Sequence, residues 1–436
     1  MRRVVCAALL LTATACVPGC SGGPDSAVII VVDTLRADHL GFYGYARATS
    51  PELDARAGHG LVFERAYSTS PWTLPAFGSL LTGHIPSEHF AGLRLSTDGT
   101  AKFSPLSPAL PTLAELLGIR YWATGAVVNN PFLQEETGIA RGFDTYDYGT
   151  ARRRADEAVD AALEWLAGRG EQRFLLLLHL FDPHLPYNAP PPFRERFTGP
   201  RPPGEPRLDL DAIRDVLSRG EKIDVEFLRN AYDEEIAFVD HELGRFFGEL
   251  EARGLLRRTL VVLTSDHGEE FFEHGEFEHG HSVFDEVVRV PLAIWGPGVD
   301  PGRAEGPVSL RDIPATVLHA LDVAAPPGFP GRSLLSRGDS ETIVAEHTLY
   351  GRERKAAVAW PWKLHWMKGG QELALFDLAA DPAERTNLWA ERKAEAQPLF
   401  DALSAIAAQG ANALEHAGVE IDPETRERLR ELGYLE

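Results

Sequence analysis

The stretch at residues 261–291, VVLTSDHGEEFFEHGEFEHGHSVFDEVVRVP, decides the expected fold. It opens with an apolar, β-branched run that stops at Asp266-His267-Gly268. A continuous apolar run of this kind is typical of a parallel strand that is covered on both faces. Ligands of open α/β sheets bind just beyond the carboxyl ends of such strands, so chemistry is expected at Asp266 and His267. A carboxylate beside an imidazole favours a divalent-metal site, and the alternative is a solvated acidic loop.

A second run of the same kind, AVIIVV at residues 27–32, ends at Asp33-Thr34. The same argument predicts a central parallel strand with the carboxylate of Asp33 at its tip. Asp33 and Asp266 are therefore expected at one edge of one sheet.

Apolar runs alternate with helical periodicity along most of the chain, which implies right-handed βαβ crossovers. We expect an α/β fold: a mostly parallel, doubly wound sheet with helices on both faces, and a small C-terminal α+β subdomain with an antiparallel sheet. The predicted organisation is a leader at 1–25, a catalytic domain at 26–330 and the subdomain at 331–436. Further strands are expected at 61–63, 121–130, 174–180 and 292–298. Two helices are expected to begin near Pro51 and Pro75, and four more are expected at 110–118, 152–166, 227–250 and 311–321. A Pro-rich, irregular excursion is expected at 186–206.

The segment STSPWTLPAFGSLLTG at 68–83 predicts a helix, with Pro75 in its first turn and Gly83 as its C-terminal cap. Thr73 then lies at or just before the helix N-terminus, where free N–H groups favour an anion. The alternative is that Thr73 only caps a packing helix.

The composition excludes some classes of partner. The chain has 436 residues, of which 64 are acidic and 43 are basic, and its formal net charge is −21. This charge argues against nucleic acid or an anionic membrane surface as the main partner. It leaves anionic substrates possible, because a bound cation reverses the local field.

The N-terminus is typical of an export leader. Arg2 and Arg3 precede an apolar segment that is too short to span a bilayer, and Cys16 follows Ala13-Thr14-Ala15. This pattern resembles a bacterial lipobox, with Cys20 as the second candidate for lipidation. We expect an exported lipoprotein that is anchored to a bacterial membrane and faces the periplasm or the exterior; the alternative is an ordinary secretory signal. All 3 cysteines lie in this leader, so the mature domain has no thiol nucleophile and no disulfide.

Several motifs together resemble the sulfatase family of the alkaline phosphatase superfamily. They run in the family's order over almost the whole mature chain: IIVVDTLRADHLGFYGY, PWTLPAFGSLLTG, HLFDPHLPY, YDEEIAFVDHELG, TSDHGEEFFEHG, FDEVVRVPL, ALFDLAADPAERTNL and LRELGYL. The resemblance implies an alkaline phosphatase-like fold and a metal held at strand tips, facing a nucleophile on a helix N-terminus. It places Asp33, Asp266 and His267 at metal-ligand positions. It also places Thr73 at the nucleophile position and His184 beside the leaving-group oxygen.

The chain departs from the family at several of these positions. Sulfatases carry Cys or Ser in a C/S-x-P-S/A-R signature and convert it to formylglycine, whereas this window reads Thr73-Leu74-Pro75-Ala76-Phe77. Asn129 stands where the family has a lysine, and His279 and His281 lie near the place of a second missing lysine. These three residues are therefore expected to contact substrate. Thr34 replaces the second aspartate of the family's Asp-Asp pair, which makes it a doubtful ligand.

The resulting hypothesis is an exported, metal-dependent hydrolase of sulfate or phosphate esters. Thr73 would be the nucleophile and one Ca²⁺, Mg²⁺, Mn²⁺ or Zn²⁺ ion the cofactor. The loss of cationic residues around the anion and the presence of a threonine lean toward phosphorus. The alternatives are a phosphotransferase acting on cell-surface glycan or lipid, and a metal-binding pseudoenzyme. The expected partner is a small-molecule, glycan or lipid ester, without nucleic acid, and with the membrane contacted only through a lipid anchor.

Overall fold

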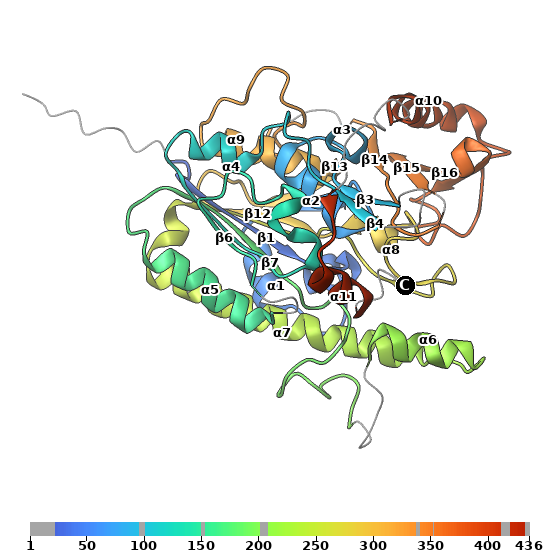
Figure 1. Ribbon diagram of the computed structural model, residues 1–436, viewed down its shortest axis with the longest axis horizontal. Helices are drawn as coiled ribbons and strands as arrows, with labels where there is room; N and C mark the ends of the chain where they lie inside the picture. The colour runs from blue at the N-terminus through green and yellow to red at the C-terminus, as the bar shows by residue number, and fades with distance from the viewer. Residues whose placement is uncertain are drawn as a thin grey trace, which may run out of the picture.

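The computed structural model describes residues 22–95, 101–149, 153–200, 208–336, 341–351, 353–410 and 419–431 (Figure 1). The predicted leader at 1–25 lies outside this range up to residue 21, as do Cys16 and Cys20. In the part of the chain that is described, no helix is both long and apolar enough to cross a membrane.

A central mixed sheet has the strand order β11-β2-β12-β8-β1-β7-β5-β6, with β13 added beside β2. The five neighbours from β8 to β6 are parallel, β12 runs antiparallel to both β8 and β2, and β13 is parallel to β2. The predicted mostly parallel α/β sheet is therefore confirmed. Its strands are β1 (Ser26–Val32), β2 (Leu61–Tyr67), β5 (Ala123–Val127), β6 (Thr145–Asp147), β7 (Phe174–Leu180), β8 (Thr259–Thr264), β11 (Arg289–Val290), β12 (Leu292–Trp295) and β13 (Gly302–Ser309).

Helices cover both faces of this sheet, as its apolar strands require. Alternate residues of β1 enter two separate cores: Ile29 packs in one and Ile30 in the other. On the first face lie α2 (Thr73–Thr82), α4 (Leu113–Gly118) and α9 (Ile313–Ala320), and on the second α1 (Pro51–Ala57), α5 (Ala155–Ala167) and α7 (Val225–Ala252) (Figure 1).

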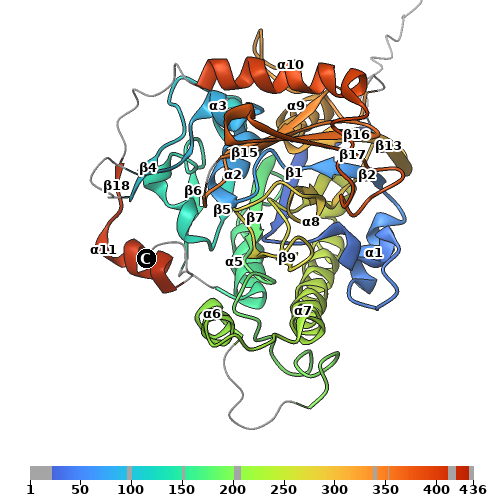
Figure 2. The same ribbon diagram turned by 90° about the vertical axis from the view of Figure 1, so that its right-hand side faces the viewer.

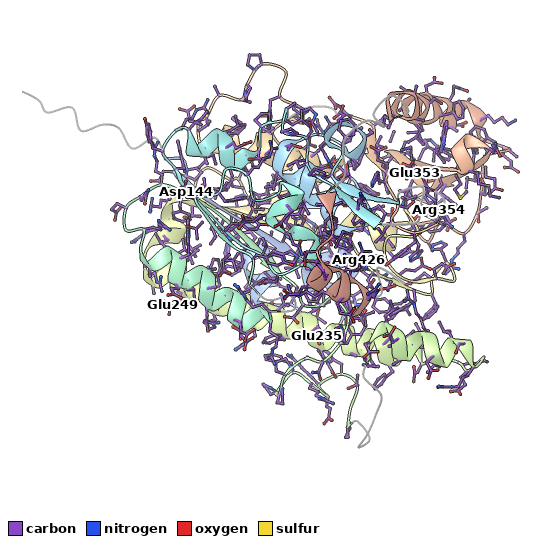
Figure 3. The ribbon with its side chains drawn as sticks, in the orientation of Figure 1. Asp144, Glu235, Glu249, Glu353, Arg354 and Arg426 are labelled. Atoms are coloured by element: carbon purple, nitrogen blue, oxygen red, sulfur yellow. The ribbon has the colours of Figure 1, made fainter. Side chains whose placement is uncertain are left out.

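The long helix α7 also holds the Pro-rich excursion. Glu235, in the middle of α7, is buried and accepts a hydrogen bond from the backbone N–H of Asn188, whereas Glu249 near the helix end is exposed (Figure 3). The excursion continues into α6 (Leu210–Ser218), which lies beside the N-terminal end of α7 in Figures 1 and 2.

The C-terminal region forms a second, antiparallel sheet, as predicted. Its order is β14-β15-β16-β17, with β14 (Ile343–Ala345), β15 (Arg354–Ala359), β16 (Trp362–Met367) and β17 (Glu372–Asp377). Helix α10 (Lys393–Gly410) packs on one face through Leu399 and Leu403 (Figure 2). The other face packs against Val283 and Val288, which lie between β10 (Phe277–Glu278) and β11.

The last described segment returns to the first domain. Strand β18 (Val419–Glu420) pairs with β4 (Ala101–Ser104), which pairs with β3 (Gly92–Leu95), and α11 (Pro423–Glu431) follows. The predicted domain boundary at 330/331 stays a prediction. The remaining elements are α3 (Pro86–His89), α8 (Asp285–Val288), β9 (Glu270–Phe271), β10 (Phe277–Glu278) and the 3-10 helices Ala37–His39, Gly41–Tyr43, Pro131–Leu133, Glu135–Thr137, Leu255–Arg258, Leu310–Asp312 and Lys368–Gly370.

Candidate active site

The tips of two adjacent parallel strands bring Asp33 and Asp266 together. Strands β1 and β8 pair in register from Ser26↔Thr259 to Val31↔Thr264, so the chain emerges from both at the same edge. Asp33, Asp266 and His267 are fully buried there, and ligand atoms from all three lie within 4.8 Å of one another. The three residues predicted as metal ligands therefore form one cluster.

The hydrogen bonds of this cluster leave a gap that a cation fits. Asp33 Oδ1 and Asp266 Oδ2 are buried and accept no hydrogen bond from any described residue. His267 Nδ1–H donates to the Gly268 carbonyl at 3.0 Å, so the neutral ring presents the Nε2 lone pair. That lone pair lies 3.6 Å from Asp33 Oδ1 and 3.4 Å from Asp266 Oδ2. Three electron-rich atoms that face each other in a buried site suit a divalent cation.

The carboxyl groups of Asp33 and Asp266 have different pKa values. Burial raises the pKa of Asp33, but the hydrogen bond from His179 and the nearby imidazoles outweigh burial and lower that pKa to about 2. Burial and the charge of Asp33 raise the pKa of Asp266 to about 6. Like charges in a low dielectric produce this splitting, which a bound cation would relieve.

Thr73 is the first residue of α2 and lies against this cluster. The preceding Trp72 is extended, and the helix ends at Gly83 with φ 76°, the left-handed cap that the sequence predicts. Thr73 is buried, and its Oγ1 lies 3.3 Å from His267 Nε2. The hydroxyl is thus placed between the candidate ligands and the positive end of the α2 dipole.

Asn130, rather than Asn129, connects Thr73 to the metal-ligand cluster. Its Nδ2 donates to Asp33 Oδ2 at 2.7 Å and to Thr73 Oγ1 at 3.2 Å, while its Oδ1 accepts from Phe132 N–H at 2.9 Å. Asn129 donates to the backbone carbonyl of His179 at 2.6 Å, and its buried Oδ1 has no described hydrogen-bond partner. Sequence reasoning named Asn129 and missed Asn130.

A hydrogen bond from helix α7 holds the turn after β1 in place. Thr34 adopts φ 56°, which is unusual for a β-branched residue, and its carbonyl accepts a hydrogen bond from the Tyr232 hydroxyl at 2.7 Å. The hydroxyl of Thr34 is buried, and no described residue hydrogen-bonds to it. This strained turn positions Asp33, and strain of this kind is concentrated at functional sites.

Two predicted histidines stand beside the cluster. The His279 ring centroid lies 4.2 Å from that of His267 and 5.1 Å from that of His184. His184 donates through Nδ1–H to the Leu185 carbonyl at 2.8 Å, and His279 Nδ1 is hydrogen-bonded to Glu269 at 2.9 Å. Burial and the neighbouring imidazoles lower the pKa of His279 well below its usual range. The structure therefore brings both rings next to the candidate ligands.

The third predicted histidine points elsewhere. His281 Nε2 lies 2.9 Å from Glu270 Oε2, and Nδ1 lies 3.3 Å from the His279 carbonyl. Its contacts among the described residues thus connect it to β9 rather than to Thr73 or the ligands. Nearby, Asp182 Oδ2 accepts the Ala155 N–H at 2.7 Å at the start of α5, which is a structural contact.

Comparison with known proteins agrees with this geometry. The family model described as Sulfatase matches residues 26–323. The chain is 25% identical to the arylsulfatase of Clostridium perfringens over 430 residues, covering 83% of this chain and 89% of that protein. It is 26% identical to arylsulfatase K of Xenopus laevis over 417 residues, covering 82% and 77%.

A similar fold occurs in solved structures. The phosphonate monoester hydrolase of Agrobacterium radiobacter superposes with a TM-score of 0.69 at 21% identity, covering 92% of this chain and 100% of that one. A protein solved with its substrate D-glucosamine-2-N,6-O-disulfate superposes with a TM-score of 0.73 at 17% identity, covering 90% and 99%. The fold, the strand-tip carboxylates and the family match lead to one conclusion: the chain belongs to the sulfatase family, a family of ester hydrolases.

Proposed function

We propose that this protein is a metal-dependent hydrolase of sulfate or phosphate esters in which Thr73 is the nucleophile. The observation that carries the proposal is the position of Thr73 Oγ1, 3.3 Å from His267 Nε2 in a cluster with two unpartnered carboxylate oxygens. A divalent cation held by Asp33, Asp266 and His267 would supply the positive charge that favours the alkoxide form of a threonine.

The protein's own groups account for the remaining requirements of the reaction. Thr73 Oγ attacks the sulfur or phosphorus atom while the bond to the leaving-group oxygen breaks, and the Thr73 proton passes to solvent. Water then hydrolyses the ester on Thr73 and restores its hydroxyl. The N-terminus of α2 would stabilise the charge on the non-bridging oxygens, and the Asn130 amide would stabilise the negative charge that develops on Thr73 Oγ1. His184, whose ring lies 5.1 Å from that of His279 beside the cluster, is our candidate for delivering a proton to the departing oxygen.

A threonine nucleophile favours phosphorus, rather than sulfur, as the atom that is attacked. Threonine does not follow the formylglycine route, and all 3 cysteines of the chain lie in the leader. The residues that replace the two lysines expected from the family are neutral or only weakly basic. Less positive charge around the anion disfavours a pocket that relies on charge alone to hold sulfate.

We also propose that the protein is exported and lipid-anchored, since Arg2, Arg3 and the apolar segment before Cys16 form a lipoprotein-type leader. Its substrate would then be a small-molecule, glycan or lipid ester outside the cytoplasm. Metabolic labelling with a radioactive fatty acid tests the anchor: label should be lost in Cys16→Ser, or in Cys20→Ser if that cysteine is the acceptor.

The activity is tested with four matched aryl esters: a sulfate, a phosphate monoester, a phosphodiester and a phosphonate monoester. We expect turnover of at least one by the metal-loaded protein, no detectable turnover by Thr73→Ala, and partial activity in Thr73→Ser. Thr82→Ala is the control, because it removes the same hydroxyl from the other end of α2, where Thr82 bonds the Gly78 carbonyl. Activity that survives in Thr73→Ala would refute the nucleophile assignment.

A further inference from the structure

Glu278 is a buried acid that the proposed reaction does not use. It ends β10, directly before His279, and only 5% of its surface is exposed. Its backbone adopts φ 75°, the left-handed conformation that glutamate rarely occupies. The surrounding structure therefore holds this side chain inward against a local backbone preference, as happens most often at functional sites.

The carboxylate of Glu278 is poorly compensated. Its Oε1 is buried and has no hydrogen-bond partner among the described residues. Among the residues that the structure describes, its cationic partner is Arg214 of α6, whose Nη2 lies 4.0 Å from Oε2 and whose side chain is 51% exposed. Such a distant, solvated partner offsets little of the cost of burying a carboxylate, and burial raises the pKa of Glu278 to about 8.

The groups near Glu278 are acidic or aromatic. Tyr187 Oη lies 3.4 Å from Glu269 Oε2, and Tyr350 N–H donates to the carbonyl of Gly280, two residues after Glu278. Burial raises the pKa values of Glu269, Tyr187 and Tyr350, and the negative charge of Glu278 raises them further. Glu269 is itself hydrogen-bonded to His279 at 2.9 Å, next to the candidate ligands. Glu278 thus lies in the segment that leads to His279, with a second buried carboxyl group and two phenol rings near that segment.

Backbone contacts fix this group of residues relative to the nucleophile. Gly280 N–H donates to the carbonyl of Pro71, two residues before Thr73, at 2.9 Å. The Gly280 carbonyl accepts from Leu349 N–H at 2.7 Å and from Tyr350 N–H at 3.1 Å. The segment that carries Glu278 and His279 therefore lies between the nucleophile loop and Tyr350.

We propose that Glu278, with Tyr187 and Tyr350, forms a subsite for a cationic alkylammonium group on the leaving-group part of the substrate. The inference rests on the proposed function, because it assumes that the anionic end of the substrate lies at Thr73. An ammonium group supplies the donor and the charge that Glu278 lacks, and phenol rings beside carboxylates favour cations. A neutral hydroxyl could bond one oxygen of Glu278, but only a cation would also favour its ionised form.

The test compares two sulfonates that differ only at one end. In 3-aminopropane-1-sulfonate an ammonium replaces the terminal methyl of butane-1-sulfonate, while the anionic head is the same. Isothermal titration calorimetry of the full, metal-loaded chain gives Kd for both ligands. Glu278→Gln removes the charge, and Glu276→Gln is the matched control, since Glu276 is an exposed glutamate of the same hairpin.

In the wild type and in Glu276→Gln we expect the amino sulfonate to bind at least about tenfold more tightly than the butyl sulfonate. In Glu278→Gln the two Kd values should become similar, while Kd for butane-1-sulfonate stays unchanged, which shows that the variant is folded. Equal affinities in the wild type, or a preference that survives in Glu278→Gln, would overturn the subsite alone. If neither sulfonate binds the wild type, the subsite is overturned, whereas the proposed function is decided separately by the aryl ester assay.

Discussion

Asn130 Nδ2 lies 3.2 Å from Oγ1 of Thr73, which is 57 residues away in sequence. The same nitrogen donates to Asp33 Oδ2 at 2.7 Å. One amide therefore sets the distance between the candidate nucleophile and a candidate metal ligand, and one of its two N–H groups is directed at the oxygen that would attack the ester.

This arrangement predicts that the two adjacent asparagines differ in effect. Asn130→Ala should lower kcat/KM by about a hundredfold or more, as when a donor to developing negative charge is removed. Asn129→Ala should mainly lower stability, by about 1 kcal/mol, because it removes the hydrogen bond to the His179 carbonyl. Steady-state kinetics and urea unfolding of both variants separate the two roles. Equal losses of kcat/KM would contradict the assignment.

Sequence alone located this site well where a motif and a strand tip coincide. Asp33, Asp266 and His267 follow apolar runs whose only suitable place is the centre of the sheet, and Thr73 follows from a helix with clear start and stop signals. The predicted strand at 121–130 ends with two adjacent asparagines, Asn129 and Asn130. One residue of register reverses the direction of a side chain there, and no sequence signal sets that register.

Other features depend on contacts between distant segments. Strand β13, GRAEGPVS, contains two glycines and a proline and is largely exposed in its first half, so its sequence gives no strand signal. The pairing of β18 with β4 joins residues about 300 apart, and local patterns do not encode it. The inward position of Glu278 depends in the same way on the hairpin that pairs β9 with β10.

Metal binding should stabilise the fold. Asp33 Oδ1 and Asp266 Oδ2 lack donors among the described residues, so a divalent cation should raise Tm, with a gain of about 2.7 kcal/mol at a hundredfold excess over Kd. Differential scanning fluorimetry after EDTA treatment, with Ca²⁺, Mg²⁺, Mn²⁺ or Zn²⁺ added back, measures the shift and ranks the ions.

Asp266→Asn provides the control for that experiment. It keeps the acceptor for the His267 N–H but removes one of two adjacent buried charges. The variant should lose the metal-dependent shift, while its metal-free form is at least as stable as the metal-free wild type. A full metal shift in Asp266→Asn would place the metal elsewhere.

A buried ion pair should hold the C-terminal sheet to the catalytic loops. Lys363 of β16 is fully buried, with Nζ 2.7 Å from Asp285 and 3.1 Å from Glu384. Burial lowers the pKa of Lys363, but these two carboxylates outweigh it and raise that pKa, so the lysine stays charged. Removing one partner of such a group leaves uncompensated buried charge.

Lys363→Met should therefore lower the free energy of unfolding by about 3 kcal/mol or more. Lys368→Met is the matched control, because Lys368 pairs with Glu372 on the surface, and its loss should cost no more than about 0.5 kcal/mol. Chemical denaturation of both variants gives the comparison. Similar losses in the two would mean that the buried group does not stabilise the contact between the sheets.

Because Glu278 is buried, it should make the free energy of unfolding fall as pH rises. Its folded pKa of about 8 lies above the value of about 4.3 expected in an unfolded chain. Between these values the folded state holds a proton that the unfolded state has released, so stability falls as pH rises. Arg214 opposes this effect, whereas Glu269, Tyr187 and Tyr350 face the group without supplying positive charge.

Unfolding free energies of the wild type and Glu278→Gln should therefore diverge with pH. The wild type should lose up to about 1.4 kcal/mol per pH unit relative to the variant between about pH 5.5 and about pH 7.5, the slope for one proton. Glu276→Gln should follow the wild type, because its side chain is exposed. A difference between the wild type and Glu278→Gln that does not change with pH would mean that Glu278 is ionised throughout, with a cationic partner already bound in the folded protein.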